Sequence, residues 1–556
     1  MAFNRSLAFR AATHLATWLP FLYGAVSAVR HGWRPISDNA GIAIRAWDVL
    51  TSYGPVLGQP SRLARGVYDP GPLQYWLLTV PAHIDARTGV LWGAALWCML
   101  VASLTIEAAR SAAGAAGGLL AGAAVLSATL WIPGITRQPL WNPWFGLMFF
   151  MAALAAGWAV MAGRRGWWPV LMVTASVAAQ AHLMYAIASG GLVLLALIVG
   201  LTDTFRHRAG SVWADFQWVA YGIAAGLVCW SAPLVQQFTG KSGNLGNLLS
   251  NPGGTGQTGG TTFGLKALAA SVQPPPLWWT SFPKIKTIAM ADHRSAAVGV
   301  AALVIMAVVL VAAIWPLRSR LTAAVAAVSL LISVAAMYTY AAVPAASIAQ
   351  WSYTFNSVTY LLAPLLPLGV LAWITLIAGV VMVVRRVRRP AAAAAAAPAG
   401  GGAAQGATAA AQRAAGLLRA PWALPACALA SVGVIMITSL MVISRERFSQ
   451  PDANASVNYY VRVAAKQIEA RIPGQPIALR IEGRDKHFRR RLTFALTYAL
   501  DTMGYRPLVA QKYAWQLGPA FTFRGQQIPQ VTVRMRPGGL GVMVGSAHAG
   551  LTSSGA

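Results

Sequence analysis

The sequence predicts an all-α polytopic membrane bundle of about eleven transmembrane helices, followed by a small extracytoplasmic α/β domain. Hydrophobic residues make up 57% of the 556 residues and charged residues only 10%, with a mean hydropathy of +0.55. Soluble domains carry about 25% charged residues. Apolar runs of about 20 residues recur along the chain, and each is long enough to cross the hydrocarbon core of a bilayer. Beyond Arg447 this apolar pattern weakens and charged residues return.

The positive charge of the chain follows the predicted spans. The formal net charge is +29, a value that alone would suit a nucleic-acid-binding protein. However, the basic residues cluster in short segments between apolar runs, where the positive-inside rule expects them. We therefore expect no nucleic-acid partner. Cys98, Cys229 and Cys427 all lie inside apolar runs, which is typical of small buried residues and not of a disulfide framework or a metal site.

The first span and its flanks predict the orientation. Arg5 and Arg10 precede an apolar stretch over residues 11–29, which is expected to be a retained helix with a cytoplasmic N-terminus. Residues 31–87 then form an outer loop with interfacial helices. The spans that follow alternate in direction across the plasma membrane and are expected at residues 88–109, 114–131, 142–164, two within 167–201 that divide near His182, 218–234, 296–315, one that ends near 343, and 361–385.

Composition divides the chain into four parts. Residues 1–389 form the transmembrane domain. Residues 390–420 are rich in Ala, Pro and Gly, which predicts a disordered cytoplasmic linker. Residues 421–444 form the last transmembrane helix, which leaves residues 445–556 as an extracytoplasmic α/β domain.

The pattern of the C-terminal domain alternates between helix and strand. Gly504 is placed to end a helix, and alternating apolar residues predict short strands. The run Arg489-Arg490-Arg491 is interpreted as a solvated helix face, with contact to anionic lipid or glycan as the alternative. The predicted elements are a helix to residue 471 capped by Asp452 or Asn454, a strand at 476–481, a helix at 487–503, and strands at 507–510 and 530–535.

Acidic residues are scarce, and several lie in the outer loop. Asp and Glu total fourteen, and Asp38 follows soon after the first helix emerges. A carboxylate at the membrane boundary is costly unless it is used, so it is a functional hypothesis by default. The alternative is a helix cap, in which Ser37 or Asp38 begins a helix over residues 40–50. That helix is expected to lie in the membrane plane. Asp48, Asp69 and Asp85 are the other acids of this loop.

The order of these features resembles a known class of membrane enzyme. An early acid in a long outer loop is followed by an interfacial helix and by the rigid turn Tyr68-Asp69-Pro70-Gly71-Pro72-Leu73. Three further stretches share the pattern: Trp141-Asn142-Pro143-Trp144, Gln180-Ala181-His182, and residues 233–240. Over residues 1–390 the chain resembles the GT-C superfamily of membrane glycosyltransferases, which use polyprenyl-phosphate sugars, and most of all its actinobacterial members.

The resemblance implies roles for individual residues. It implies that Asp38 is the catalytic base. The departing donor phosphate needs positive charge or hydrogen-bond donors at the outer boundary, and Arg137, His182 and Arg294 are placed to bind it. The alternatives are an arginine that extends to lipid headgroups and a histidine that satisfies a helix break. Asn142, Gln180 and Gln237 would position substrate or brace helix ends.

Asp69 departs from the family pattern, because many relatives carry His-Pro-Pro or a similar element where this chain has Asp69-Pro70-Gly71-Pro72. Asp69 would therefore be a second acid that positions substrate, a metal ligand or a turn former. The sparse acids form no ligand cluster in the sequence. We expect no obligatory metal or cofactor besides the lipid-linked sugar donor, with a divalent metal left open.

The long loop over residues 238–293 is glycine-rich. Its glycines have neither the preceding strand nor the following helix of a phosphate-cradling motif. The loop is expected to be a mobile lid or an acceptor-binding loop. Trp278, Trp279 and Phe282 would stack on sugars or anchor at the interface.

The leading hypothesis is transfer of a sugar from a polyprenyl-phosphate donor to an extracytoplasmic cell-envelope glycan, lipid or protein, with inversion at the sugar. The first alternative is a transporter or lipid flippase. Transporters often show internal repeats and charged mid-membrane positions, and neither is evident here. The second alternative is an inactive scaffold of the same fold.

Overall fold

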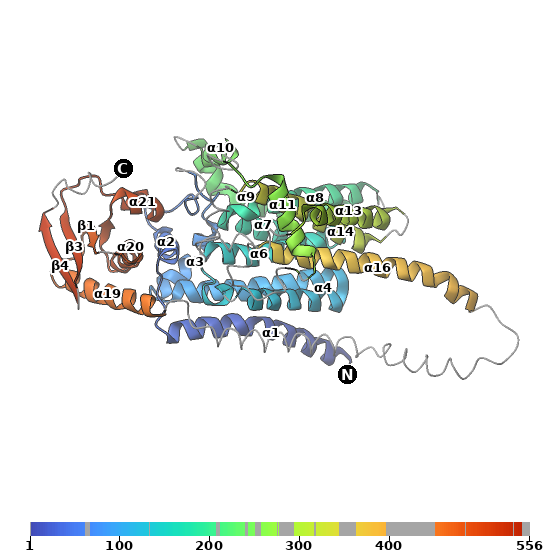
Figure 1. Cartoon of the computed structure of the whole chain (residues 1–556), viewed down its shortest axis with the longest axis horizontal. Helices are drawn as coiled ribbons and strands as arrows, with labels where there is room; N and C mark the ends of the chain where they lie inside the picture. Colours follow the sequence, from blue (N-terminus) through green and yellow to red (C-terminus); the bar gives the residue numbers. More distant parts are fainter. Residues whose placement is uncertain are drawn as a thin grey trace.

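The computed structural model describes most of the chain. The described residues are 2–61, 67–132, 134–206, 212–239, 243–250, 257–274, 276, 294–315, 319–343, 363–395, 451–483, 485–536 and 539–546. Within them, seven helices are long and apolar enough to cross a membrane: Gly89–Trp131, Asn142–Met161, Leu183–Gly200, Phe216–Thr239, Ala296–Ile314, Arg320–Ala341 and Leu365–Val384. The predicted class is confirmed, because these helices form a bundle that carries a small C-terminal sheet (Figure 1).

The long helices run side by side along the longest axis of the molecule (Figure 1). The predicted last span, residues 421–444, lies outside the described residues. The predicted linker begins at residue 390, but α16 continues to Ala395 because alanine favours the helix. The bundle contains α1 (Ala2–Arg30), α4 (Gly89–Trp131), α6 (Asn142–Met161), α7 (Trp168–Ala181), α8 (Ala186–Arg206), α9 (Val212–Thr239), α13 (Ala296–Ile314), α14 (Arg320–Ala341) and α16 (Leu365–Ala395).

Two breaks in the bundle coincide with predicted span boundaries. Helix α4 bends at Ala113 and Gly114, where Gly114 has φ 69°, a conformation that favours glycine. The bend separates the two spans predicted at residues 88–109 and 114–131. Between α7 and α8 the backbone of His182 is extended, and Leu183–Tyr185 form a short 3₁₀ turn. The division predicted near His182 is therefore correct.

The segment over residues 238–293 is more than a loop where the structure describes it, and its role as a mobile lid or an acceptor-binding loop stays a prediction. It contains α10 (Asn244–Ser250) and α11 (Gly260–Val272). Helix α11 packs between α13 and α14, and most of its later residues are buried. Gly264 lies so close to the backbone of Met337 that a Cβ would overlap it. Hydropathy missed α11 because the helix is too short to span a membrane. Trp278, Trp279 and Phe282 lie outside the described residues.

The C-terminal domain is a four-stranded sheet with helices, in the order β2-β1-β3-β4. Strand β1 pairs in parallel with β2 and β3, and β3 pairs antiparallel with β4. Gly504 follows α20 with φ 86°. Sequence analysis missed α21 and β4. The elements are α19 (Pro451–Glu469), β1 (Pro476–Glu482), α20 (Lys486–Asp501), β2 (Arg506–Leu508), α21 (Gln511–Leu517), β3 (Pro529–Arg536) and β4 (Gly539–Ser546).

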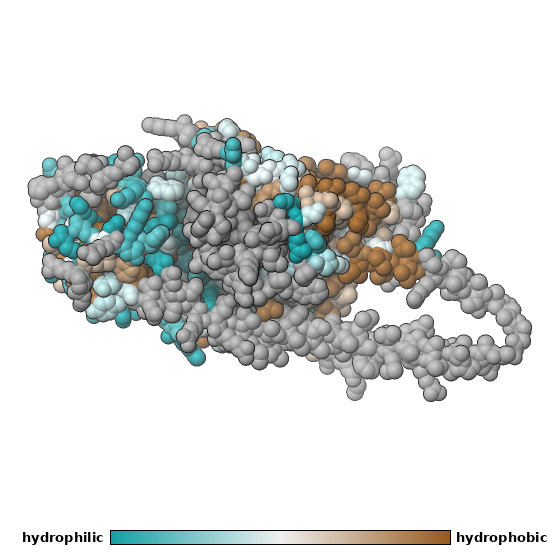
Figure 2. Space-filling view, viewed as in Figure 1, coloured by the Kyte–Doolittle hydropathy of each residue, from teal (hydrophilic) through white to brown (hydrophobic). Residues whose placement is uncertain are grey.

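Helix α2 (Asp38–Asp48) lies between the bundle and the C-terminal domain (Figure 1). It packs on α3 (Leu73–Ile84) on one side and on α20 and α21 on the other. Nearly every residue of α2 is buried. Protein therefore covers both sides of α2, while its expected orientation in the membrane plane stays a prediction. The surface of the molecule differs between its two ends. Figure 2 shows a hydrophilic surface over the C-terminal domain and a hydrophobic surface over part of the helical bundle.

Candidate functional site

The Asp38 carboxylate lies where the bundle meets the C-terminal domain. Trp141 Nε1 donates a hydrogen bond to Asp38 Oδ2 at 3.4 Å. Arg490 Nη2, on α20, lies 3.5 Å from Asp38 Oδ1. The Asp38 side chain is 34% exposed, so both parts of the molecule hold this carboxylate while solvent still reaches it. A carboxylate in this position can accept a proton from a bound hydroxyl group.

The residue before Asp38 has an unusual backbone. Ser37 has φ 59° and ψ −129°, and among the described residues it is the non-glycine residue with a positive φ. Such conformations cost about 1–3 kcal/mol and concentrate at functional sites. Ser37 makes no side-chain cap hydrogen bond to α2, and the Asp38 carboxylate contacts Trp141 and Arg490 instead. The helix-cap alternative is therefore correct about where the helix starts, because α2 begins at Asp38 with Ser37 in the N-cap position, but no side-chain cap hydrogen bond from Ser37 forms.

Arg490 does not belong to a fully solvated face. Besides its ion pair with Asp38, it donates to Gln516 Oε1 at 2.8 Å and lies over the Phe494 ring at 5.5 Å. Its neighbour Arg489 donates to the carbonyl of Gly483. The solvated interpretation fails here because α20 turns this face toward α2, and sequence alone does not show how one domain docks on another.

Asp69 is the second acid of the site and is buried. Leu183 N–H donates to its Oδ1 at 3.2 Å, and Asn142 Nδ2 donates to its Oδ2 at 3.3 Å. Burial raises the pKa of the Asp69 carboxyl well above its ordinary value, while these two hydrogen bonds oppose the rise. Asp69 thus joins the rigid turn before α3 to the starts of α6 and the 3₁₀ turn at Leu183.

We predict that Asp69→Ala lowers the free energy of unfolding by about 1–3 kcal/mol, because it leaves two buried donors without their acceptor. Asp69→Asn is expected to cost less, since it retains one acceptor oxygen and the side-chain shape. Denaturant unfolding of the full chain in detergent measures both variants. An alanine variant as stable as the wild type would contradict this structural role.

The dipeptide Trp141-Asn142 connects the two acids. Trp141 binds Asp38, and Asn142 binds Asp69 and also the carbonyl of Ala181 at 3.1 Å. Gln180 lies beside them: its Nε2 donates to the Cys229 carbonyl at 2.8 Å, and Leu73 N–H donates to its Oε1 at 3.4 Å. In the described structure Asn142 and Gln180 thus brace helix ends around Asp69.

Gln237 and Asn244 brace the other end of the turn. Leu245 N–H and Gly246 N–H donate to Gln237 Oε1 at 3.0 and 3.3 Å. Asn244 exchanges two hydrogen bonds with the backbone of Tyr68, at 2.9 and 3.0 Å. Helix α10 is therefore tied both to α9 and to the segment that holds Asp69. Sequence analysis did not single out Asn244.

The three predicted phosphate-binding residues belong to different segments of the chain. His182 directly precedes Leu183, whose backbone binds Asp69, so it belongs to this site. Arg137 is buried at the end of α5 (Gly134–Arg137), which packs on α1, α4 and α6. Arg294 is half-buried before α13. Helix α13 packs on α11, α14 and α16, and none of these carries Asp38, Asp69 or the partners described above.

Within the part of the chain that the structure describes, no three His, Cys, Asp or Glu side chains gather closely enough to hold a metal ion.

A buried ionic cluster at the other end of α2 was missed by sequence analysis. Arg506 Nη1 lies 3.0 Å from Asp48 Oδ1 and 3.0 Å from Asp501 Oδ1. The Arg506 guanidinium is also stacked 4.0 Å from the ring centroids of both Tyr53 and Phe521. The side chains of Asp48 and Asp501 are only 6% and 4% exposed. This cluster docks the C-terminal domain on α2.

The cluster predicts a pH dependence. Burial and the negative charge of Asp48 raise the pKa of Asp501 from 3.8 to about 7, against the attraction of Arg506. Between these two values the folded state binds more protons than the unfolded state, so stability falls as pH rises through the window. We expect a lower unfolding temperature at about pH 8 than at about pH 5, and a flatter profile in Asp501→Asn. If the unfolding temperature of the wild type and that of Asp501→Asn changed equally with pH, this role of Asp501 would be contradicted.

Comparison with known proteins gives a likeness of overall shape only. No protein-family model matches the chain, and no curated protein matches it in sequence. Two solved structures of ArnT from Cupriavidus metallidurans are similar to it. The apo structure has a TM-score of 0.45 at 15% identity and covers 96% of this chain and 93% of its own. The structure bound to undecaprenyl phosphate has a TM-score of 0.47 at 14% identity and covers 96% and 94%.

Proposed function

We propose that this chain is an integral membrane glycosyltransferase that moves a sugar from a polyprenyl-phosphate donor to an extracytoplasmic cell-envelope acceptor. The observation that carries the proposal is the Asp38 carboxylate, partly exposed after the strained Ser37 and held from both the bundle and the C-terminal domain. The resemblance of residues 1–390 to the GT-C superfamily supports it. The acceptor is a glycan, a lipid or a protein.

The proposed reaction is a single displacement. Asp38 accepts the proton of an acceptor hydroxyl while the hydroxyl oxygen attacks the anomeric carbon of the donor sugar. The bond from that carbon to the phosphate oxygen breaks, and polyprenyl phosphate leaves with the electron pair. One displacement inverts the configuration at the anomeric carbon. The lipid phosphate is a good leaving group, so the protein has mainly to align the reactants and remove the proton.

Positive charge at the outer membrane boundary would stabilise the departing phosphate. Arg137, His182 and Arg294 remain the candidates for this role, and Arg490 adds a cation next to Asp38. Asp69, Asn142, Gln180 and Gln237 would position substrate through the braced turn that they form. In this proposal the protein lies in the plasma membrane with its N-terminus in the cytoplasm and its C-terminal domain outside.

The test uses the full chain in sealed proteoliposomes. Undecaprenyl-phosphate carrying a labelled hexose or pentose is supplied together with an envelope extract as acceptor. We expect label to move to the acceptor with release of undecaprenyl phosphate, and NMR of the product to show inversion. Movement of the labelled lipid across the bilayer without any transfer would contradict the proposal and favour a flippase.

A further inference from the structure

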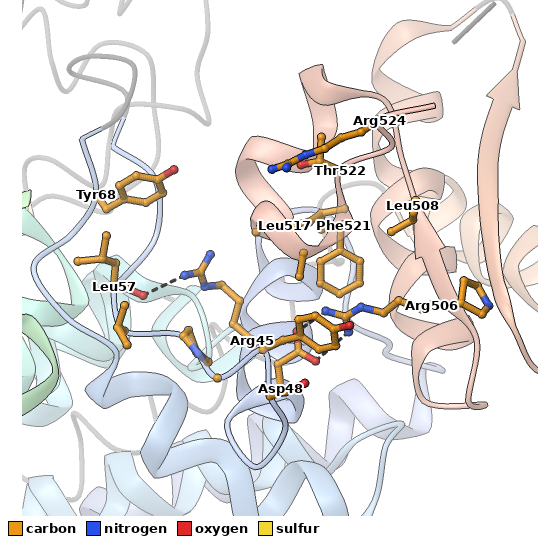
Figure 3. Close-up of a pocket in the computed structure, with 18 of the residues that line it drawn as sticks. Arg45, Asp48, Leu57, Tyr68, Arg506, Leu508, Leu517, Phe521, Thr522 and Arg524 are labelled. Atoms are coloured by element: carbon orange, nitrogen blue, oxygen red, sulfur yellow. Dashed lines mark hydrogen bonds and ion pairs between the residues drawn. The ribbon is translucent and has the colours of Figure 1, made fainter. Parts of the chain in front are cut away.

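A cavity of about 730 Å³ lies between the segment after α2 and the C-terminal domain. Residues 52–57 and Tyr68 form one wall. The other wall is formed by Arg506, Leu517, Gly518, residues 520–522, Arg524 and Gln526. Figure 3 shows the two walls facing each other across the space above Arg45 and Asp48. The volume falls in the range of small-molecule sites, about 300–1,000 Å³.

Arg45 extends from α2 into this cavity. Its side chain is buried, with 6% exposure, and Nη2 donates to the carbonyl of Leu57 at 3.0 Å. Among the described residues, its Nε and Nη1 have no hydrogen-bond partner. Figure 3 shows the guanidinium between Tyr68 on one side and Leu517 and Phe521 on the other. Buried donors of a charged group are normally paired, so the two nitrogens point to a missing ligand.

The charges around the cavity favour an anion. Arg45, Arg506 and Arg524 line it, and Asp48 is the acidic residue of the lining. The Asp48 carboxylate is bound by Arg506, with Nη1–Oδ1 at 3.0 Å and Nη2–Oδ2 at 3.4 Å. The negative charge of Asp48 is therefore paired with the charge of Arg506 and not with that of Arg45.

Gly518 lies against the Arg45 guanidinium on the opposite wall. Gly518 has φ 128°, a conformation that favours glycine. A Cβ at this position would lie 3.6 Å from Arg45 Nη1. The glycine thus keeps a side chain away from this nitrogen.

We propose that this cavity binds an oxyanion, a phosphate or a carboxylate, that is carried by a saccharide. Arg45 would bind the oxyanion through the positive charge of its guanidinium and the donors of Nη1. The cavity is larger than an inorganic ion needs, and Ser52, Tyr53, Tyr68, Thr522 and Gln526 offer hydroxyl, amide and aromatic groups to a sugar. Arg45 lies roughly 10 Å along the helix from Asp38, so this is a second site, and binding there does not require transferase activity.

The test measures binding to the full chain in nanodiscs of phosphatidylcholine without any sugar donor. The probes are glucose 6-phosphate, glucuronate, inorganic phosphate and uncharged glucose, followed by calorimetry. We expect at least one of the charged sugars to bind about tenfold or more tightly than glucose, and Arg45→Gln to lose that preference. Arg534→Gln removes an exposed arginine of the same domain outside the cavity and should bind as the wild type does.

A second variant tests the proposal even if Arg45→Gln does not fold. Arg524 is exposed at the rim, so Arg524→Gln should fold normally and weaken binding of the charged sugars several-fold. The proposal is overturned if glucose binds as tightly as both charged sugars, or if Arg45→Gln folds and binds unchanged. A parallel measurement in phosphatidylglycerol nanodiscs tests the source of the anion. Binding of that lipid through Arg45, with no binding of charged sugars in phosphatidylcholine, would overturn the saccharide ligand.

Discussion

Asp38→Asn is expected to lower the rate of glycosyl transfer by about 10²–10⁴-fold, the usual contribution of a general base. Asparagine keeps the size of the side chain and an oxygen that can accept from Trp141, but it cannot take up the acceptor proton. The ion pair with Arg490 is partly exposed and worth about 0–1 kcal/mol, so the variant should remain folded. Initial rates with a labelled lipid-linked sugar, together with thermal unfolding, measure both effects.

Asp85→Asn is the matched control for Asp38→Asn. Asp85 also belongs to the segment predicted as the outer loop, and the hydrogen bonds of its carboxylate in the described part of the chain lie within its own turn, to Arg87 N–H and to Thr88. Its replacement should leave transfer close to the wild-type rate. Full transfer by a folded Asp38→Asn protein would remove Asp38 from the mechanism. An equal loss in both variants would point to a general disturbance of the segment.

The membrane part of the fold follows from local sequence. Hydropathy locates spans because each must be apolar over its own length, and breaks such as Gly114 and His182 are visible as local interruptions. Helix α11 does not follow, because a short helix packed inside a bundle lacks the length that hydropathy detects. In the C-terminal domain the strand pattern revealed β1 and β3, while the glycine-rich β4 has weak strand propensity and forms by pairing with β3.

The site is only partly visible in the sequence for a similar reason. Asp38, Asp69, Asn142 and Gln180 stand out because they are polar residues at the ends of apolar spans, and the structure brings the last three together. Arg490 and Arg506 contact residues of α2 that are far away along the chain, with Arg506 and Asp48 separated by 458 positions. No local pattern encodes such a pairing, so the docking of the two domains had to come from the structure.

Arg506→Gln is expected to destabilise the docking of the C-terminal domain by about 3–5 kcal/mol, the usual cost of removing one partner from a buried ion pair. The loss leaves Asp48 and Asp501 buried next to each other without their shared cation, and it removes the stacking on Tyr53 and Phe521. Hydrogen exchange of α2 and α20 in the full chain should report this local opening. Transfer should fall as well, because opening withdraws Arg490 from Asp38.

Arg534→Gln again provides the matched control, because it removes an exposed ion pair with Glu482 that should be worth about 0–1 kcal/mol. Arg506→Gln destabilises the docking by leaving two carboxylates without a cation and by removing the stacking on two aromatic rings. A triple variant that combines Arg506→Gln with Asp48→Asn and Asp501→Asn separates these two contributions. If uncompensated buried charge dominates, the triple variant should be more stable than Arg506→Gln and its stability should vary less with pH. If the triple variant is no more stable, stacking on Tyr53 and Phe521 carries the docking energy. Unchanged hydrogen exchange in Arg506→Gln would show that the cluster does not hold the domain in place.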